Sequence, residues 1–466
     1  MRFQVLALDY DGTLAHHGLV DEETVAALER VRASGRKLVL VSGRELSDLR
    51  RVFPHLHLFH LAVLENGGIL HVPGSKETRR LAQPPPEEFV ATLRRRGVGP
   101  ISVGEVIVAT WEPHDVAVLD TIRELGLEMQ VIFNKGAVMV LPSGVNKASG
   151  LKAALAELRL SPHNAVGVGD AENDHAFLDL CECSVAVSNA LPSLKERADV
   201  VTVGDHGAGV RELIDALVGS DLRELEGRLG RHALLLGTTA DGGRLTFSPF
   251  SPPLLVTGTS GGGKSTLATS IIEQLADRGY QFCILDPEGD YRDLAGVTVL
   301  GTEGRVPGAD EVIQVLEKPD QSVVVNMIGV TLGDRPAFFD TMFSRLFELR
   351  TRTGRPHWIF LDEAHHLAPG EGKPPLLPTP LDGLLLITVH PEHVARSLLQ
   401  AVETVLVIGT TPRETLAGFA AAVGVSAPDV PAEPLPPGEA IVWQVRTGAP
   451  PVRIRAAVEE RYTAPA

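Results

Sequence analysis

Two aspartates near the N-terminus have the residue type and spacing of a phosphoryl-transfer pair. Asp9 and Asp11 stand at the end of a short apolar run, with one residue between them. A carboxylate can attack phosphorus to form an acyl-phosphate, and a neighbouring acid can protonate the leaving oxygen. Because side chains alternate along an extended chain, we expect both carboxylates to point the same way. Phosphate and carboxylate are both anionic, so this chemistry calls for a divalent cation.

Further polar residues follow later apolar runs. Ser42 and Gly43 come directly after the second run, Lys147 follows an insert, and Asp170 and Asp174 follow a third run. A hydroxyl and backbone amides can hold phosphate, a lysine adds positive charge, and paired carboxylates are ligands for a hard ion such as Mg²⁺. Ligands of open α/β sheets bind at the carboxyl ends of the strands, so we expect these residues at one edge of a sheet.

These motifs, taken in order over residues 1–220, resemble the haloacid dehalogenase (HAD) phosphatase superfamily. The resemblance implies that Asp9 is the nucleophile and a magnesium ligand. It implies that Asp11 is the general acid/base and that its backbone carbonyl also binds magnesium. The other implied roles are phosphate binding by Thr13, Ser42, Gly43, Lys147 and Asn173, catalytic assistance by Ser42 and Lys147, and magnesium binding by Asp170 and Asp174.

The position of the insert indicates a subgroup. An insert between Ser42 and Lys147, together with the sequence ENGG at 65–68, resembles the Cof-like and sugar-phosphate phosphatases. The resemblance implies phosphomonoester hydrolysis rather than dehalogenation, because dehalogenases lack the second aspartate that Asp11 supplies. It leaves the phosphorylated substrate open.

A glycine-rich segment in the second half fits GxxxxGK[ST], the Walker A motif of a P-loop. It follows an apolar run and opens a predicted helix, which is the context that the motif requires. Backbone N–H groups and the helix dipole then converge on phosphate. Lys264 is expected to reach the β- and γ-phosphates and Ser265 to bind magnesium. The predicted nucleotide-binding residues are Gly258, Thr259, Ser260, Gly261, Gly262, Gly263, Lys264, Ser265 and Thr266.

A second apolar run ends in Asp362 and Glu363, the expected partners of the P-loop. Asp362 is predicted to be a water-mediated magnesium ligand and Glu363 the base that polarises the attacking water. An acid at this place favours ATP hydrolysis over storage of bound nucleotide. A further run ends near Thr388 and His390, where His390 has either a γ-phosphate-sensing or a structural role.

Residues 230–460 resemble the HerA/FtsK-like translocase ATPases. The resemblance rests on a predicted hairpin with its turn at 241–243, on LDPEGDY at 285–291 and on FLDEAHHL at 360–367. The sequence departs from the family in having His390 where glutamine is usual and in lacking an N-terminal β-barrel. Both departures weaken the inference of DNA translocation, and neither weakens the inference of ATP binding.

Motors of the P-loop class commonly receive an arginine from a neighbouring subunit at the γ-phosphate. No arginine stands close to the P-loop in this sequence, so we predict a homo-oligomer that closes into a ring, with a hexamer as the candidate size. Arg413 is the first candidate for the shared arginine, and Arg396 and Arg350 are the next.

The elements that must position these residues are of the α/β class. Apolar runs alternating with amphipathic stretches predict a HAD Rossmann-like parallel sheet with an inserted α+β cap, then a second α/β P-loop domain. We expect the phosphatase core at 1–82 and 146–221, the cap at 83–145 and the ATPase domain at 222–466.

Finer expectations concern the two inserts. In the cap, strands are predicted at 101–111, 128–133 and 137–142, around a helix at 116–125. Residues 369–383 are too rich in proline and glycine for a helix or a central strand, so we expect a mobile insert there.

Composition limits the function classes. The 466 residues contain 43 Lys plus Arg against 59 Asp plus Glu, a net charge of −16, which opposes nucleic-acid binding over most of the surface. Three cysteines indicate a reducing compartment, and the spacing of Cys181 and Cys183 does not suit zinc. We see neither a signal peptide nor an apolar run that could cross a membrane, so we expect a soluble cytoplasmic protein.

Two hypotheses for the whole chain stay open. In the first, a Mg²⁺-dependent phosphatase is fused to an ATP-driven motor that processes nucleic acid. In the second, the C-terminal half senses nucleotide and regulates a phosphatase that acts on sugar phosphates or other small metabolites. A third and weaker hypothesis is that the C-terminal half is a small-molecule kinase. It is weaker because Glu363 suits the activation of water.

Overall fold

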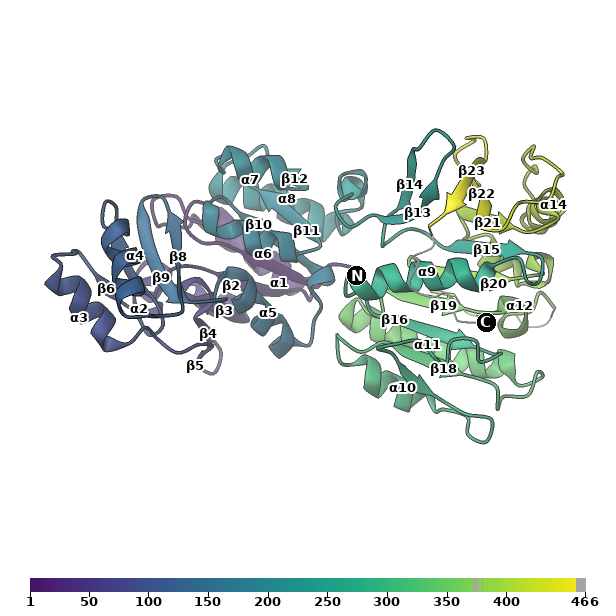
Figure 1. Cartoon of the computed structure of the whole chain (residues 1–466), viewed down its shortest axis with the longest axis horizontal. Coiled ribbons are helices and arrows are strands. Elements are labelled where there is room, and N and C mark those ends of the chain that lie inside the picture. The colour runs from purple at the N-terminus through teal and green to yellow at the C-terminus, as the bar shows by residue number, and fades with distance from the viewer. Residues whose placement is uncertain (372–374, 376, 379, 458–466) are drawn as a thin grey trace. The chain divides into compact units, whose positions relative to one another are not determined.

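The computed structural model describes residues 1–371, 375, 377, 378 and 380–457. The chain divides into two compact units, Met1–Arg231 and His232–Ala466, and each is described by itself (Figure 1). Of the predicted insert at 369–383, residues 372–374, 376 and 379 lie outside the described residues, as does the end of the predicted second domain at 458–466. The domain limits given above stay predictions.

A sheet of 8 strands forms the centre of the first unit, in the order β12-β11-β10-β1-β2-β3-β4-β5. The first six strands in that order are parallel, and β4 and β5 are antiparallel additions at the edge. The strands are β1 (Val5–Leu8), β2 (Lys37–Val41), β3 (Leu61–Leu64), β4 (Ile69–Val72), β5 (Glu77–Arg80), β10 (Ala165–Gly169), β11 (Cys183–Ala186) and β12 (Val200–Val201).

Strands β1, β3, β10 and β11 are buried at every position, because helices cover both faces of this sheet. Helix α1 packs against α8, and α5 packs against α6. The helices are α1 (Glu22–Ala33), α2 (Leu46–Val52), α5 (Lys147–Leu158), α6 (His175–Leu180), α7 (Pro192–Arg197) and α8 (His206–Ser220). Short 3₁₀ helices are η1 (Leu56–Leu58), η2 (Glu65–Gly67), η3 (Pro162–Asn164), η4 (Glu172–Asp174) and η5 (Arg223–Arg228).

The start of α5 is set by a capping box. The side chain of Asn146 accepts a hydrogen bond from the backbone N–H of Ser149 (3.0 Å), and Ser149 Oγ accepts one from the backbone N–H of Asn146 (3.0 Å). Lys147 is therefore held as the first residue of the helix. Gly67, with a φ of +103°, lies under this turn, because a Cβ there would be 2.0 Å from the carbonyl oxygen of Asn146.

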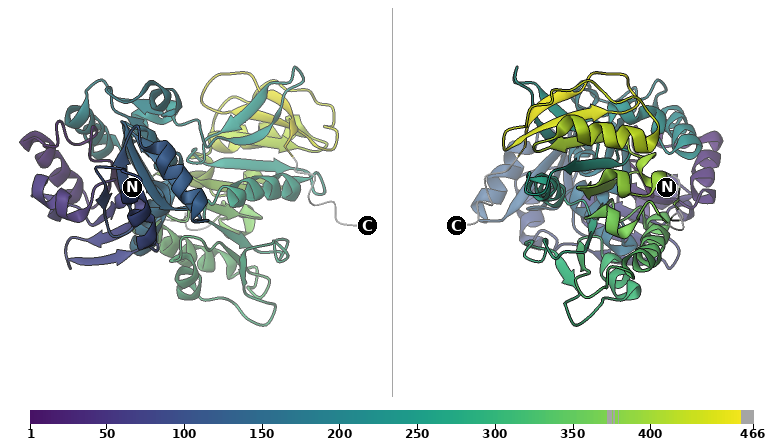
Figure 2. Two further views of the ribbon diagram at one scale, coloured as in Figure 1. Left: turned by 60° about the vertical axis from the view of Figure 1, so that its left-hand side comes forward. Right: turned by 90° about the vertical axis from the view of Figure 1, so that its right-hand side faces the viewer.

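A second sheet, of 4 antiparallel strands in the order β6-β7-β9-β8, forms the cap. Its apolar side chains Val108, Val138 and Val140 pack with Phe89 and Val118 of two helices that lie along one face (Figure 1, Figure 2). Met139 and Leu141, on the other face, pack into the core of the first unit. The elements are α3 (Glu87–Arg95), β6 (Ser102–Val103), β7 (Val108–Trp111), α4 (Asp115–Glu124), β8 (Met129–Asn134) and β9 (Ala137–Pro142).

The cap differs from the prediction in two places. Helix α3 was not predicted, and the single strand expected at 101–111 is divided into β6 and β7, which pair with each other. The turn between β6 and β7 is held by Glu65, whose buried carboxylate accepts hydrogen bonds from the backbone N–H groups of Glu105 (3.1 Å), Val106 (2.7 Å) and Ile107 (3.0 Å). Because this partner is distant in sequence, the local apolar pattern could not show the turn.

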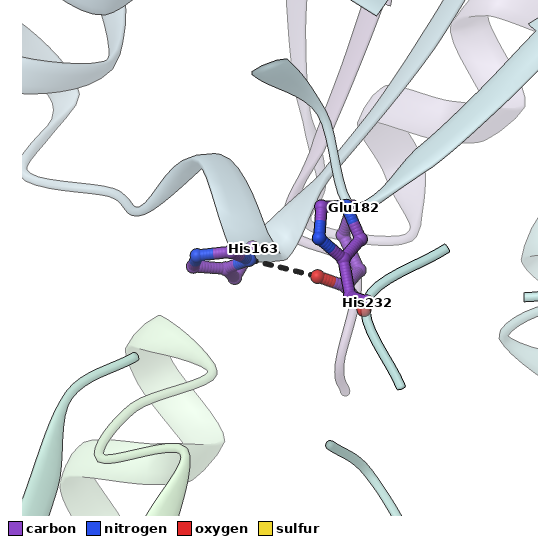
Figure 3. Close-up of side chains that lie close together, drawn as sticks. All are labelled: His163, Glu182 and His232. Atoms are coloured by element: carbon purple, nitrogen blue, oxygen red, sulfur yellow. Dashed lines mark hydrogen bonds and ion pairs between the residues drawn. The ribbon is translucent and has the colours of Figure 1, made fainter. Parts of the chain in front are cut away.

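Glu182 lies between the two cysteines of the first unit as a buried, paired carboxylate. The thiols of Cys181 and Cys183 are free and buried. The Nδ1 atom of His163 lies 2.8 Å from Oε2 of Glu182 (Figure 3), and Nη2 of Arg2 donates to Oε1 at 3.3 Å. These contacts join the N-terminus, η3 and β11 within the core.

The second unit is built on a sheet of 11 strands among the described residues, in the order β14-β13-β23-β22-β21-β15-β20-β19-β16-β18-β17. The strands from β21 to β17 in that order are parallel, and the others are antiparallel. They are β13 (Leu234–Thr238), β14 (Arg244–Phe247), β15 (Leu254–Gly258), β16 (Phe282–Asp286), β17 (Thr298–Leu300), β18 (Val323–Asn326), β19 (Trp358–Leu361), β20 (Leu384–Thr388), β21 (Thr404–Ile408), β22 (Glu439–Gln444) and β23 (Val452–Ala456).

Helices cover this sheet on both faces, since neighbouring residues of β15 belong to different apolar clusters. Leu255 packs with α10, α11 and α14, whereas Val256 packs with α9. The predicted hairpin is present as β13 and β14, with Gly242 in the turn at a φ of +84°. The helices are α9 (Lys264–Asp277), α10 (Ala309–Leu316), α11 (Arg335–Thr353), α12 (Ala364–Leu367), α13 (Arg396–Leu399), α14 (Pro412–Val423) and the 3₁₀ helix η6 (Pro391–His393).

None of the helices in the described part of the chain has the length and apolar character needed to cross a membrane.

Glu65→Ala is expected to loosen the attachment of the β6–β7 turn. Three N–H groups, of which those of Val106 and Ile107 are buried, lose a charged acceptor, which costs about 2–3 kcal/mol. Hydrogen exchange of the amides of 105–107 in the full chain should accelerate by roughly tenfold or more. Glu105→Ala is the matched control, because it removes an exposed carboxylate from the same turn and keeps the backbone amide. Equal exchange in both variants would refute the role given to Glu65.

Candidate active sites

The first candidate site lies at the carboxyl ends of β1 and β10. Asp9 follows β1, while Asp170 and Asp174 follow β10, the parallel neighbour of β1. One oxygen from each of the three carboxylates lies within 4.8 Å of the others, and all three residues are buried. The three acids that the sequence placed at one sheet edge are thus brought together.

Lys147 is the cation at the centre of this cluster. Its Nζ atom lies 2.6 Å from Oδ1 of Asp9 and 2.6 Å from Oδ1 of Asp174, and its side chain is 2% exposed. Burial lowers the pKa of Lys147, but the charges of Asp174 and Asp9 outweigh it and the net shift is upward. The ammonium therefore stays charged between the two carboxylates.

Lys147 alone does not balance the negative charge of the three carboxylates. Burial, followed by the charge of Asp174, raises the pKa of Asp9 to about 8, although Lys147 opposes the shift. Burial also raises the pKa of Asp170. Asp9, Asp170 and Asp174 together form a buried oxygen donor set that fits a hard divalent cation such as Mg²⁺.

The carboxylate of Asp11 turns to a different partner. Its Oδ2 accepts a hydrogen bond from Nε of Arg44 and its Oδ1 from Nη2, each at 2.7 Å, and the side chain is 43% exposed. Strand β1 ends at Leu8 and the chain turns at Tyr10. We expected Asp9 and Asp11 to point the same way because both would lie on extended chain. The chain is not extended through these residues, so this expectation was wrong.

Two predicted phosphate-binding hydroxyls, those of Thr13 and Ser42, are buried at the same edge of the sheet. Thr13 Oγ1 donates to Oδ1 of Asp170 at 3.3 Å. Ser42 Oγ accepts a hydrogen bond from the backbone N–H of Arg44 at 3.1 Å. Each hydroxyl thus has a protein contact that fixes it at the sheet edge.

Asn66, the second residue of the ENGG motif, was given no role from the sequence and joins two predicted residues. Its amide lies against Gly43, where a Cβ would stand 3.3 Å from either terminal atom of the amide. Its Oδ1 accepts a hydrogen bond from Nδ2 of Asn173 at 2.9 Å. Oδ1 of Asn173 is buried and has no hydrogen-bond partner among the described residues.

Lys135 is a site residue that sequence reasoning missed. It lies at the tip of the β8–β9 hairpin of the cap, and its Nζ is 2.8 Å from Oδ2 of Asp170 and 3.5 Å from the carbonyl oxygen of Asp11. Gly12, at a φ of +90°, permits this approach, because a Cβ there would be 2.3 Å from Asp170 Oδ2 and 2.8 Å from Lys135 Nζ. The Lys-Gly pair between two apolar runs is a hairpin signal, but it does not show what the tip reaches.

The second candidate site is the P-loop between β15 and α9. The Nζ atom of Lys264 donates to the carbonyl oxygens of Gly258 (3.3 Å) and Thr259 (3.1 Å). A Cβ on Gly258 would be 2.0 Å from the carbonyl oxygen of Ile408, so only glycine fits there. Gly263 caps α9 at a φ of +97°.

Several of the predicted nucleotide-binding residues are exposed. They are Ser260 and Gly261 in the loop and Ser265 and Thr266 in the first turn of α9. The backbone N–H of Gly262 donates a hydrogen bond to the carbonyl oxygen of Thr259 (3.1 Å).

Asp362 and Glu363 follow β19, which is separated from β15 only by β20. Burial, then the charges of Glu363 and Asp286, raise the pKa of Asp362 to about 8. Burial also raises the pKa of Glu363, against the charge of Lys264. Burial lowers the pKa of Lys264, against the charges of Glu363 and Asp362. The three predicted residues are therefore close enough to feel one another's charge.

Asp286, in the LDPEGDY segment, organises a loop beside them. Its buried carboxylate accepts hydrogen bonds from the backbone N–H groups of Gly289 (2.7 Å), Asp290 (3.1 Å) and Tyr291 (3.0 Å). The motif thus supplies a fixed turn after β16 whose charge acts on Asp362.

The end of β20 is occupied by protein contacts. Oγ1 of Thr388 is buried, accepts a hydrogen bond from the backbone N–H of His390 (3.0 Å) and lies 2.9 Å from Nδ1 of His365. Burial lowers the pKa of His365 to about 4, so its imidazole is neutral. The half-exposed ring of His390 lies 3.2 Å from Oε1 of Glu392.

The three candidate shared arginines differ in their surroundings. Arg350 is part of the interior, since it donates to the carbonyl oxygens of Pro356 and Asp382, each at 2.8 Å, and burial lowers its pKa to about 10. This corrects its place among the candidates, because its guanidinium is committed within its own unit. Arg413 is half-exposed and donates to the carbonyl of Val430 (2.8 Å), while Arg396 is exposed at the start of α13.

Lys147→Ala is expected to destabilise the first unit by about 3–5 kcal/mol, because it leaves Asp9 and Asp174 buried without their cation. Calorimetry of the full chain should show the unfolding transition of this unit at a lower temperature. Lys152→Ala is the matched control, since Lys152 is an exposed lysine of the same helix. If both variants melt like the parent protein, the Lys147 contacts contribute nothing to stability.

Comparisons with known proteins match the two units separately. The family model for haloacid dehalogenase-like hydrolases matches residues 6–98 and 117–214, and the model for the central domain of helicase HerA matches residues 250–336. A phosphoglycolate phosphatase of Methanothermobacter thermautotrophicus is 29% identical over 226 residues, which cover 46% of this chain and 99% of that protein. One of Halorubrum lacusprofundi is 31% identical over 214 residues, covering 44% and 92%.

Among solved structures, a haloacid dehalogenase-like hydrolase from Bacteroides thetaiotaomicron aligns with a TM-score of 0.41 and 19% identity over 46% of this chain and 99% of that one. The family models and the curated relatives confirm both resemblances drawn from the motifs. The chain belongs to the haloacid dehalogenase-like hydrolase family and carries a HerA-like P-loop domain after its phosphatase unit.

Proposed function

We propose that the first unit hydrolyses a small phosphomonoester through an aspartyl-phosphate at Asp9, with Mg²⁺ as cofactor. The observation that carries this proposal is the buried cluster in which Lys147 bridges Asp9 and Asp174 beside Asp170. The names of the curated relatives support 2-phosphoglycolate as the first substrate to test. Sugar phosphates are the alternative, from the resemblance to the Cof-like subgroup.

In the first half-reaction, a carboxylate oxygen of Asp9 attacks phosphorus while the bond from phosphorus to the ester oxygen breaks. The leaving oxygen takes a proton from Asp11, which requires one of the two Arg44 hydrogen bonds to Asp11 to open. Lys147 holds the attacking carboxylate in place, and the hydroxyls of Thr13 and Ser42 orient the phosphoryl oxygens.

In the second half-reaction, Asp11 is a carboxylate and takes a proton from water. The water oxygen attacks phosphorus, the bond to the Asp9 oxygen breaks, and inorganic phosphate leaves with Asp9 regenerated. Asp9, Asp170, Asp174 and the carbonyl of Asp11 are the groups that would hold Mg²⁺, which would supply positive charge to offset repulsion between the phosphate and the carboxylates.

For the second unit we propose ATP binding and hydrolysis. The P-loop glycines and the start of α9 supply N–H groups for phosphate, and Lys264 exchanges the carbonyls of Gly258 and Thr259 for phosphate oxygens. Glu363 polarises the attacking water, and Asp362 is the residue that would hold a hydrated Mg²⁺.

The coupling of the two units has two candidate forms. A motor that acts on nucleic acid predicts ATP turnover stimulated by DNA or RNA, and the HerA match favours it. A nucleotide-sensing regulator predicts phosphatase activity that depends on ATP without such stimulation. The ring with Arg413 as shared arginine belongs to the motor form and stays a prediction. The three free buried thiols support a cytoplasmic location.

Asp9→Asn is expected to lower phosphatase turnover by about 10⁴-fold or more, because the amide cannot attack phosphorus. Release of inorganic phosphate from 2-phosphoglycolate and from p-nitrophenyl phosphate, measured with Mg²⁺, checks this. ATP hydrolysis by the same variant should be unchanged, which controls for folding of the chain. Near-normal phosphatase turnover would show that the chemistry assigned to Asp9 is wrong.

Lys264→Ala and Glu363→Gln are expected to separate ATP binding from hydrolysis. Loss of Lys264 should remove tight ATP binding, whereas Glu363→Gln should bind ATP and hydrolyse it about 10²–10³ times more slowly, since only water activation is lost. Equilibrium binding of labelled ATP and phosphate release measure the two effects. Equal loss of ATP binding in both variants contradicts the separate roles.

A further inference from the structure

The cap delivers one lysine to the phosphatase site, and its position is defined by a tight turn. Lys135 and Gly136 form the two-residue connection between β8 and β9, with φ values of +49° and +85°. Two-residue turns of this kind fix the register of a hairpin and leave its tip little freedom. Residues 83–145, the predicted cap, contain no other lysine. The Lys135 ammonium reaches Oδ2 of Asp170 at 2.8 Å.

Asn134, next to Lys135, offers a polar group on the same tip. It pairs with Ala137, so its side chain shares a sheet face with Met139. That face meets the core, because Sδ of Met139 accepts a hydrogen bond from Nδ2 of Asn66 at 2.9 Å. Oδ1 of Asn134 is buried and has no hydrogen-bond partner among the described residues. A buried acceptor without a partner calls for a donor rather than for an anion. A half-turn of the amide exchanges its two ends, so that Nδ2 of Asn134 takes this place and donates to an anionic group.

The two lysines of the site are engaged to different degrees. Lys147 is buried and lies between two carboxylates, so it is committed to the reaction centre. Lys135 has a half-exposed side chain and one carboxylate partner, Asp170, which is itself an expected cation ligand. Once Asp170 binds a cation, Lys135 is the positive charge on the cap side that remains for another anion.

We propose that Asn134 and Lys135 form the subsite for the carboxylate of a short phosphorylated acid, with the ammonium of Lys135 as its counter-ion. The proposal rests on the phosphatase function proposed for the first unit and names its substrate class. A phosphate ester with an uncharged tail gains nothing from this subsite. The cap therefore selects between substrates that share the same phosphoryl chemistry.

The test compares two phosphate esters that differ only at the tail, 2-phosphoglycolate and 2-hydroxyethyl phosphate. The measured quantity is the ratio of their kcat/KM values in the full chain with Mg²⁺. Lys135→Met should lower this ratio by at least about tenfold, the size of a lost charge-assisted hydrogen bond, and Lys135→Arg should restore part of it. Lys76→Met is the matched control, because Lys76 is an exposed lysine with a φ of +62° between β4 and β5.

A binding measurement separates failure of the subsite from failure of the phosphatase proposal. In an Asp9→Asn background, calorimetry compares the Kd of 2-phosphoglycolate with that of inorganic phosphate. Lys135→Met should weaken the first at least about tenfold more than the second, whether or not the parent protein turns over either ester. Equal weakening of both ligands, or no weakening of either, would overturn the proposal. An unchanged kcat/KM ratio in a chain that hydrolyses both esters would overturn it as well.

Discussion

The buried contact of Lys147 with Asp9 and Asp174 is the constraint on which the first unit depends. Two buried carboxylates, one after β1 and one in η4 after β10, share one buried ammonium at 2.6 Å each. Charges so placed are stable only while every partner remains, so the capping box of α5 and the ends of β1 and β10 must hold their positions. The same contact holds the proposed nucleophile ready for attack.

Each unit holds a buried aspartate close to a lysine, but the two lysines have different partners. Each has a buried aspartate whose pKa is raised to about 8, Asp9 in one and Asp362 in the other. Each also has a lysine close by. Lys147 is locked between carboxylates, whereas Lys264 rests on backbone carbonyls that a phosphate can replace. The first site therefore suits chemistry on a protein carboxylate, and the second suits the binding of a nucleotide.

The sequence predicted the site residues that lie at the ends of strands. It did not predict features that depend on contacts between residues distant in sequence. Parallel strands share an edge, so apolar runs followed by polar residues were enough to bring Asp9, Asp170 and Asp174 together. The turn imposed by Glu65 and the reach of Lys135 involve partners from other elements. No local pattern carries such information. The direction of the Asp11 side chain was misjudged for a different reason, because β1 ends at Leu8 and the chain turns at Tyr10.

The central claim is that Asp9 carries the phosphoryl group during turnover. The direct measurement uses Asp11→Asn with p-nitrophenyl phosphate, whose leaving group needs no proton, so that the second half-reaction alone is slowed. After acid quenching and proteolysis, mass spectrometry locates any covalent phosphoryl group. The account predicts one hydroxylamine-sensitive phosphoryl group on the peptide that contains Asp9, and none when Asp9→Asn is added. A phosphoryl group on a different residue, or turnover with no phosphorylated protein at any time, would contradict it.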